Sequence, residues 1–167
     1  LNDEAGGRTN ENIAVYRHAL LEFDAVELER QEEILLSSNV PIATLTHSGG
    51  KSLHAIVRVD AATEREYRDA IAFLWDYFAK YNLDQKNKNP SRLSRLAGVM
   101  RGDKRQSLLA VGLGAPQFAE WRDGVKLERE SGEAITAEAL LEEIDINDKS
   151  RVLLGANRWL CKGFSSV

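Results

Sequence analysis

Two acidic residues in the stretch "LLEFDAV" have a spacing that suits metal chemistry. Glu22 and Asp24 stand two residues apart among apolar neighbours, so on a β-strand both carboxylates would point to one face. Buried carboxylates on one face repel each other unless a positive group lies between them. Mg²⁺ is such a group, since it binds one or two carboxylates and bridges to substrate phosphates. The alternative is that both acids are exposed where the strand ends.

The stretch "HSGGKSLHAIVRVD" offers a second set of polar side chains. Ser52 and His54 are also two residues apart and would project from one face of a strand, with Lys51 at the preceding turn. A Walker A phosphate loop is not indicated, because Leu45 stands where its first glycine belongs and a strand follows instead of a helix. A histidine with a purely structural role remains the alternative.

The net charge of −4 conceals two stretches of opposite sign. Acids dominate from Glu22 to Glu33, and bases dominate from Lys86 to Arg105. A cleft between these stretches could bind cations on one wall and phosphates on the other, although both could equally be solvated surface. The bases of the second stretch are Lys86, Lys88, Arg92, Arg95, Arg101, Lys104 and Arg105. At this spacing Arg92 and Arg95 would share one face of a helical turn.

Three apolar stretches predict the strands that would position these residues. Residues 15–24 fit a buried strand, although their periodicity also allows a helix. Residues 41–47 and 52–59 are separated by Gly49 and Gly50, a typical turn between antiparallel strands. We therefore expect these two stretches to pair as a hairpin.

Helices are predicted around these strands. Residues 26–38 are rich in helix formers, and a long amphipathic helix should begin at Thr63, with Glu66 in the capping-box position. A polar loop with one short helical turn should follow. The remaining expectations are a strand over 106–114 and short helices over 115–124 and 136–144.

The order "EFD", "SLH" and "LD" resembles the three motifs of the archaeo-eukaryotic primase superfamily. Leu83 and Asp84 supply the third motif. Asp60 competes for this role, but it is better placed to cap the helix that begins near Thr63. The runs "SGGKSLHAIVRVDA" and "NPSRLSRLAGVMR" resemble the bacterial and phage primase-polymerase branch, over residues 16–112. Glu22 departs from the aspartate often found in the family.

This resemblance implies an α+β fold, with an RRM-like antiparallel sheet backed by helices. It also implies a DNA primase/polymerase that transfers nucleotides on a template during replication, with nucleoside triphosphates and single-stranded or primed DNA as partners. Two Mg²⁺ or Mn²⁺ ions would be held by Glu22, Asp24 and Asp84, which with His54 form the catalytic set. The expected nucleotide-binding residues are Lys51, Ser52, His54, Arg92 and Arg95. The expected contacts to nucleic-acid phosphate are Lys86, Lys88, Arg101, Lys104 and Arg105.

The expected domain organisation rests on the polar composition of the first residues and on this resemblance. We expect a flexible lead-in over residues 1–14, a catalytic core over 15–130 and a connecting segment over 131–167. The tail "NRWLCKGFSSV" resembles the approach to the first strand of a RecA-like ATPase, which would place a helicase domain after it in a longer chain. An ordinary strand and turn is the alternative.

Other functions remain open. The lone Cys161 and the lack of an apolar run of membrane-spanning length argue against a disulfide, a zinc site and a membrane partner, and favour a cytoplasmic protein. The chain could instead be a non-catalytic DNA-binding module for replication initiation. A metal-dependent phosphodiesterase or nuclease would also use carboxylates, histidine and Mg²⁺ or Mn²⁺.

Overall fold

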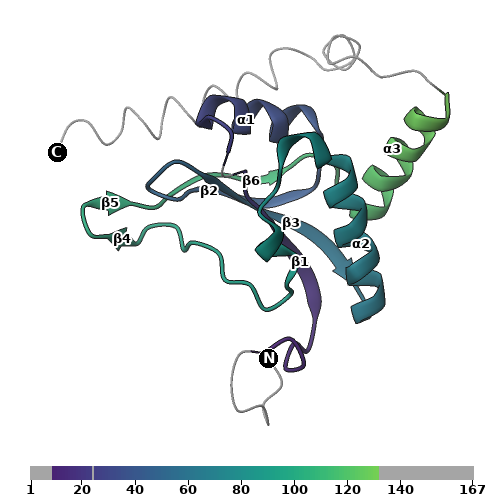
Figure 1. Ribbon diagram of the computed structural model, residues 1–167, viewed down its shortest axis with the longest axis horizontal. Coiled ribbons are helices and arrows are strands. Elements are labelled where there is room, and N and C mark those ends of the chain that lie inside the picture. Colours follow the sequence, from purple (N-terminus) through teal and green to yellow (C-terminus); the bar gives the residue numbers. More distant parts are fainter. Residues whose placement is uncertain (1–8, 24, 132–167) are drawn as a thin grey trace. The chain divides into compact units, whose positions relative to one another are not determined.

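The computed structural model describes residues 9–23 and 25–131, and a four-stranded antiparallel sheet forms its centre (Figure 1). The order across the sheet is β1 (Tyr16–Leu21), β3 (Leu53–Ala61), β2 (Ile42–His47) and β6 (Ser107–Leu113). The helices are α1 (Leu28–Ser37), α2 (Glu64–Tyr77) and α3 (Phe118–Ser131). The expected α+β class is therefore confirmed, and the more specific RRM-like arrangement stays a prediction.

Smaller elements follow α2. Two 3-10 helices, η1 (Ala79–Tyr81) and η2 (Gln85–Lys88), lead into a segment without regular structure. A small hairpin of β4 (Met100–Arg101) and β5 (Lys104–Arg105) then precedes β6. Figure 1 shows this hairpin projecting to the left, on the opposite side of the picture from α2.

The connections explain why α1 lies between β1 and β2. Both strands pair antiparallel with β3, so they run parallel to each other. Parallel strands need a crossover connection, usually a helix, and cannot be joined by a tight turn. The hairpin of β2 and β3 is confirmed, with Ile42 opposite Val57 and His47 opposite Leu53. Residues 16–21 form a strand because β3 supplies their hydrogen-bonding partners.

The two faces of β3 have different roles. Leu53, Ala55, Val57 and Val59 are buried as the alternating pattern predicts, and the apolar stripe of α2 provides the matching hydrophobic surface. The buried residues of this stripe are Tyr67, Ile71, Leu74 and Trp75, followed by Phe78 at the C-cap of the helix. His54, which lies between Leu53 and Ala55, and Ser52, which directly precedes β3, project from the other face.

The start of α2 agrees with its predicted cap. The Glu66 backbone N–H donates to Oγ1 of Thr63 at 3.2 Å, and the Glu66 carboxylate accepts from the Ala62 N–H at 2.9 Å. The expectation that Asp60 caps this helix is wrong, since Thr63 occupies the cap position.

Two further helical predictions need correction. Residues 92–96 have no regular structure, so Arg92 and Arg95 do not share a helical turn; the short turn lies earlier, at η2. The helix expected over 115–124 begins at Phe118 and continues to Ser131. The predicted helix over 136–144 and the tail resembling an ATPase lie outside the described residues.

Internal contacts divide the chain into two units, residues 1–122 and 123–167, and α3 begins in the first. The site described below lies entirely within the first unit. The division expected at residue 130 stays a prediction. No helix among the described residues is both long and apolar enough to cross a bilayer.

Candidate active site

The turn between β2 and β3 positions Ser52 at the start of β3. The Ser48 N–H donates to the Ser52 carbonyl at 3.0 Å, which closes the turn. Gly49 has φ +76°, and a Cβ there would lie 2.9 Å from the Arg105 carbonyl oxygen. Only glycine combines this backbone conformation with such a close approach, so Gly49 lets the turn pack against the β4–β5 hairpin.

Glu22 contacts two polar side chains, Ser52 just before β3 and His54 within it. Leu21, the last residue of β1, pairs with Ala55, so Glu22, which follows the strand, lies beside His54. Ser52 Oγ donates to Glu22 Oε1 at 2.8 Å, and His54 Nε2 lies 3.2 Å from the same oxygen. Asn87 Nδ2 donates to Oε2 at 3.4 Å. Three residues that are distant in the sequence therefore converge on one carboxylate, whose side chain is 14% exposed.

The surroundings of His54 define which ring nitrogen carries its proton. The Arg95 backbone N–H donates to His54 Nδ1 at 3.4 Å, and Ser94 Oγ lies 3.2 Å from the same nitrogen. Because a backbone N–H can only donate, Nδ1 is an acceptor and the proton of the neutral ring is assigned to Nε2. His54 Nε2 can therefore donate directly to Glu22.

These donors hold Glu22 in its anionic form. The hydrogen bond from His54 lowers the pKa of Glu22 to about 2, against the opposing effect of burial and with help from Ser52 and Asn87. Hydrogen bonding to the charged form of a carboxyl group favours that form. Glu22 thus carries a full negative charge at neutral pH, as a ligand for a divalent cation must.

This low pKa predicts acid-dependent stability. Because the folded-state pKa of Glu22 lies below the ordinary glutamate value of 4.5, its contribution is complete above about pH 4.5 and is lost as the pH falls toward 2. We expect this contribution to be about 1–2 kcal/mol, allowing for partial solvent screening. Urea unfolding between pH 6 and pH 3 should show a smaller loss of stability in Glu22→Gln than in the parent protein. Parallel pH profiles for the two proteins would contradict the assignment.

Asp84 is connected to Glu22 by a backbone hydrogen bond. Its N–H donates to the Glu22 carbonyl at 3.1 Å, and its Oδ2 lies 3.7 Å from Arg92 Nη2. Arg92 Nε also donates to Asn87 Oδ1 at 2.9 Å, so Arg92 connects Asp84 to the residue that binds Glu22. These contacts place Asp84 within the cluster.

Asp60 lies elsewhere, which favours Asp84 as the third acid. The register pairs Tyr16 with Ala61 and Leu21 with Ala55, so Asp60 stands near the end of the β1–β3 pair that is remote from Glu22. Its side chain is 61% exposed and lies 3.9 Å from Arg58 Nε.

Two of the three predicted metal ligands, Glu22 and Asp84, are among the described residues. A backbone hydrogen bond links Asp84 to Glu22, and the carboxylate oxygens that both residues carry suit a hard cation such as Mg²⁺. Asp24 lies outside the described residues. Among residues 9–23 and 25–131, no group of three or more His, Cys, Asp or Glu side chains is arranged to hold a metal ion. The described donors fit a divalent cation chemically, and the full ligand set stays a prediction.

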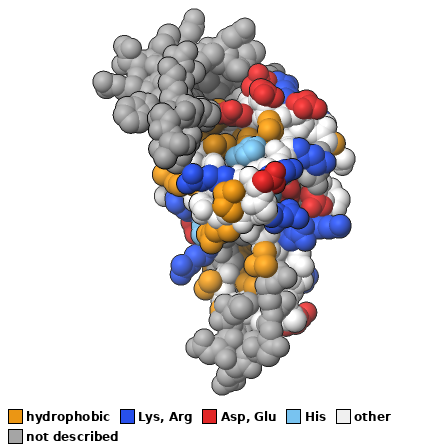
Figure 2. Space-filling view, turned by 90° about the vertical axis from the view of Figure 1, so that its left-hand side faces the viewer, with side chains coloured by type: hydrophobic (Ala, Val, Ile, Leu, Met, Phe, Trp, Pro, Cys, Tyr) orange, Lys and Arg blue, Asp and Glu red, His pale blue; other side chains and the backbone are white. Residues whose placement is uncertain are grey.

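Cationic side chains surround a cavity of about 470 Å³ at this cluster. Its charged and polar lining includes two acids, four bases, Ser52 and His54: the acids are Glu22 and Asp103, and the bases are Lys51, Arg95, Arg101 and Lys104. Figure 2 views the molecule from this side, and Lys and Arg side chains gather there around a histidine and acidic side chains. An anion such as a triphosphate would find opposite charge in this cavity.

Most of the residues predicted to bind nucleotide and nucleic-acid phosphate are divided between two cavities, and the division differs from the predicted one. Of the predicted nucleotide-binding residues, Arg92 does not line this cavity. Arg101 and Lys104, predicted to contact nucleic-acid phosphate, do line it. Lys86 and Lys88 line another cavity, together with Arg92. Arg105 is exposed on β5.

Gln31 positions the site, although no motif in the sequence predicted this role. This residue of α1 is fully buried. Its Nε2 donates to the carbonyls of Val26 and Lys51, and its Oε1 accepts from the Leu53 N–H at 2.8 Å. Gln31 therefore holds the backbone on both sides of Ser52. The sequence did contain a signal for this role. A glutamine stands on the apolar stripe of a predicted helix, three residues after Leu28 and four before Leu35.

Asn87 and Ser94 were also missed. Asn87 is buried and connects Glu22 to Arg92, whereas Ser94 contacts His54. Both belong to a polar segment whose sequence has no helical or strand periodicity. The spacing of its residues therefore did not indicate these contacts.

Comparison with known proteins supports the fold. No protein-family model matches the sequence, and no curated protein matches it significantly. Among solved structures, the chain is similar to the AEP domain of the Cyanophage S-2L primase-polymerase (PrimPol), with a TM-score of 0.58 and 21% identity. The match covers 71% of this chain and 64% of that one, slightly less than two thirds of its length. The protein therefore has a fold similar to that of a phage primase-polymerase AEP domain.

Proposed function

We propose that this protein is a DNA primase/polymerase that catalyses metal-dependent, template-directed nucleotidyl transfer. The observation that carries the proposal is the convergence of Ser52 and His54 on Glu22 inside a cavity lined by four Lys and Arg side chains. Carboxylates beside phosphate-binding cations are what this chemistry requires. The similarity in fold to a primase-polymerase domain supports the same conclusion.

Each residue has a defined part in the proposed reaction. Glu22, Asp84 and the undescribed Asp24 would hold Mg²⁺ or Mn²⁺. When bound, these ions would lower the pKa of the attacking 3′-hydroxyl group and stabilise the pyrophosphate leaving group. Ser52 and His54 now donate to Glu22, and in the substrate complex they would donate to triphosphate oxygens instead.

The surrounding cations would bind the incoming nucleotide. Lys51 and Arg95 stand beside Ser52 and His54 in the cavity, and Arg101 and Lys104 come from the β4–β5 hairpin. Their positive charge would attract the triphosphate and neutralise the charge that develops as pyrophosphate leaves.

Incorporation of a labelled nucleotide tests this function directly. The protein is mixed with a primed DNA template, one labelled deoxynucleoside or ribonucleoside triphosphate, and Mg²⁺ or Mn²⁺. We expect template-directed extension that EDTA abolishes. Shortening of the labelled DNA without extension would instead indicate a nuclease, and binding without either reaction would indicate a non-catalytic DNA-binding module.

A comparison of two aspartates tests the third acid. Asp84→Asn should lower incorporation by about 10²-fold or more, because it removes a charge near Glu22 that would hold the cation. Asp60→Asn is the matched control and should leave incorporation within about twofold of the parent, since Asp60 is remote from Glu22. The reverse result would assign the third acid to Asp60.

A further inference from the structure

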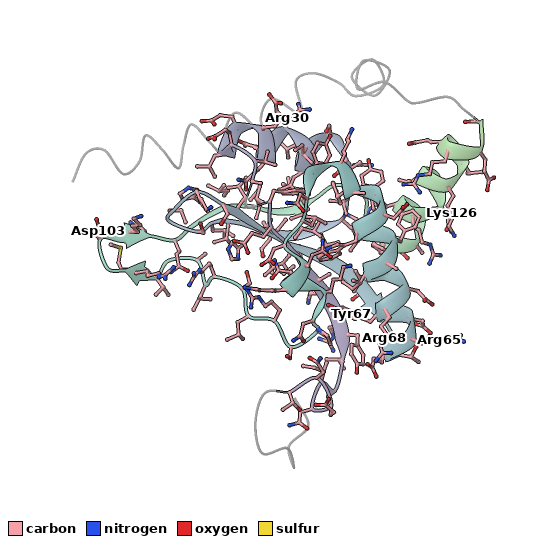
Figure 3. All side chains as sticks on the ribbon, viewed as in Figure 1. Arg30, Arg65, Tyr67, Arg68, Asp103 and Lys126 are labelled. Atoms are coloured by element: carbon pink, nitrogen blue, oxygen red, sulfur yellow. The ribbon has the colours of Figure 1, made fainter. Side chains whose placement is uncertain are left out.

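A second cavity, separate from the one at Glu22, lies between the start of α2 and η2. Its volume is about 560 Å³. Arg68 and Tyr67 contribute from α2, and Lys86 and Lys88 contribute from η2. Figure 3 shows Tyr67 and Arg68 in the first part of α2, with Arg65 beside them on the outer side of the helix.

The charge of this cavity is opposite to that of the whole chain. Among the described residues that line it, four are cations, Arg68, Lys86, Lys88 and Arg92, and one is a carboxylate, Glu64. Arg68 Nη2 lies 2.5 Å from that carboxylate. Lys86 and Lys88 have no carboxylate partner within the described ranges, although the Lys88 ammonium lies 5.7 Å from the centre of the Trp75 ring. A chain of net charge −4 thus gathers excess positive charge at one place.

The remaining lining favours an anion as well. Burial raises the pKa of Tyr67 to about 12, so its phenol group is neutral and does not repel an anion. Asn10, Gln85 and Asn89 add neutral polar side chains. Arginine and lysine together, with neutral hydrogen-bonding groups, are typical of phosphate recognition.

We propose that this cavity binds a phosphate group of a nucleic-acid strand. The inference rests on the proposed function and extends it to residues outside the reaction cavity, among them Arg68. Arg92 connects the two places: it lines the second cavity and donates to Asn87, which in turn donates to Glu22. Only two side chains, those of Arg92 and Asn87, would separate a strand bound here from Glu22. A template or primer must lie this close to the proposed reaction centre.

The test measures binding, not catalysis, in EDTA so that nucleotidyl transfer is absent. Fluorescence anisotropy of a labelled single-stranded oligonucleotide is recorded at several salt concentrations for the full chain and three variants. Arg68→Gln should weaken binding by about fivefold and lower the slope of log K against log salt by about 0.7, as expected for one lost contact to single-stranded phosphate. Glu64→Gln should strengthen binding, because it removes the one carboxylate found among the described lining residues.

Arg65→Gln is the matched control. Arg65 is an exposed arginine of the same helix that does not line the cavity, so its variant has the same net charge as Arg68→Gln. Equal weakening by both variants would overturn the proposal in favour of general attraction by positive charge. An increase in affinity for Glu64→Gln cannot arise from misfolding, and its absence would also overturn the proposal.

Two kinds of phosphate are distinguished by using the same strand with a 5′-phosphate or a 5′-hydroxyl group. An effect of Arg68→Gln on both strands assigns the cavity to an internal backbone phosphate, and an effect only on the phosphorylated strand assigns it to the strand terminus. If the parent protein binds neither strand, both this inference and the proposed function fail. If it binds both and Arg68→Gln changes nothing, only this inference fails.

Discussion

Glu22→Gln is expected to reduce nucleotide incorporation by about 10²–10³-fold while the protein remains folded. Glu22 is anionic because His54, Ser52 and Asn87 donate to it. A neutral amide keeps the size of the side chain but cannot supply the charge that a divalent cation needs. The measurement is the initial rate of labelled nucleotide incorporation on a primed template at saturating Mn²⁺.

The control for this variant is Glu29→Gln. Glu29 is an exposed acid in the first turn of α1, so the change in net charge is identical and the cavity is untouched. Circular dichroism at neutral pH establishes that both variants are folded. An incorporation rate for folded Glu22→Gln within about threefold of the parent would remove Glu22 from the reaction, since a lost charge at the reacting centre costs much more.

Gln31→Met is expected to lower the free energy of unfolding by about 2–4 kcal/mol. Methionine approximates the volume of glutamine, so the effect would come from hydrogen bonding and not from a cavity. The Leu53 N–H and the carbonyls of Val26 and Lys51 would lose their partner. Unsatisfied buried polar groups retain their full desolvation cost. Urea denaturation measures the change.

Gln85→Met provides the comparison. Gln85 is exposed on η2, where its side chain donates to the Leu83 carbonyl at 3.0 Å, so we expect a change within about 0.5 kcal/mol. A change equally small for Gln31→Met would mean that water replaces its hydrogen bonds. The positioning role is tested separately under conditions where Gln31→Met is fully folded. There, incorporation should still fall, because the backbone on both sides of Ser52 is no longer held.

Local patterns predicted most elements correctly, because each depends on neighbours in the sequence. The alternation of Leu53, Ala55, Val57 and Val59 predicted β3, and Thr63 with Glu66 predicted the start of α2. The polar segment that follows η2 was predicted less well. Arg92 was expected on a helical turn, but its guanidinium binds Asn87 and Asp84 instead.

Sequence spacing placed Ser52 and His54 on one face of a strand, and the resemblance to the primase superfamily implied that Glu22 would join them. Only the register of β1 against β3 decided that Glu22 lies beside His54 and that Asp60 does not. A shift of one residue between antiparallel strands moves a side chain to the opposite face, and no local pattern determines that shift.

The composition of the site also depended on tertiary structure. The sequence by itself determined which side chains could bind a cation or a phosphate, because charge and hydrogen-bonding capacity belong to the residue. The fold decided which of them share a cavity: it separated Arg92 from Arg95 and placed Arg101 and Lys104 beside His54. Gln31 became part of the site for the same reason, since contacts between residues far apart in the chain arise only when helices and strands pack together.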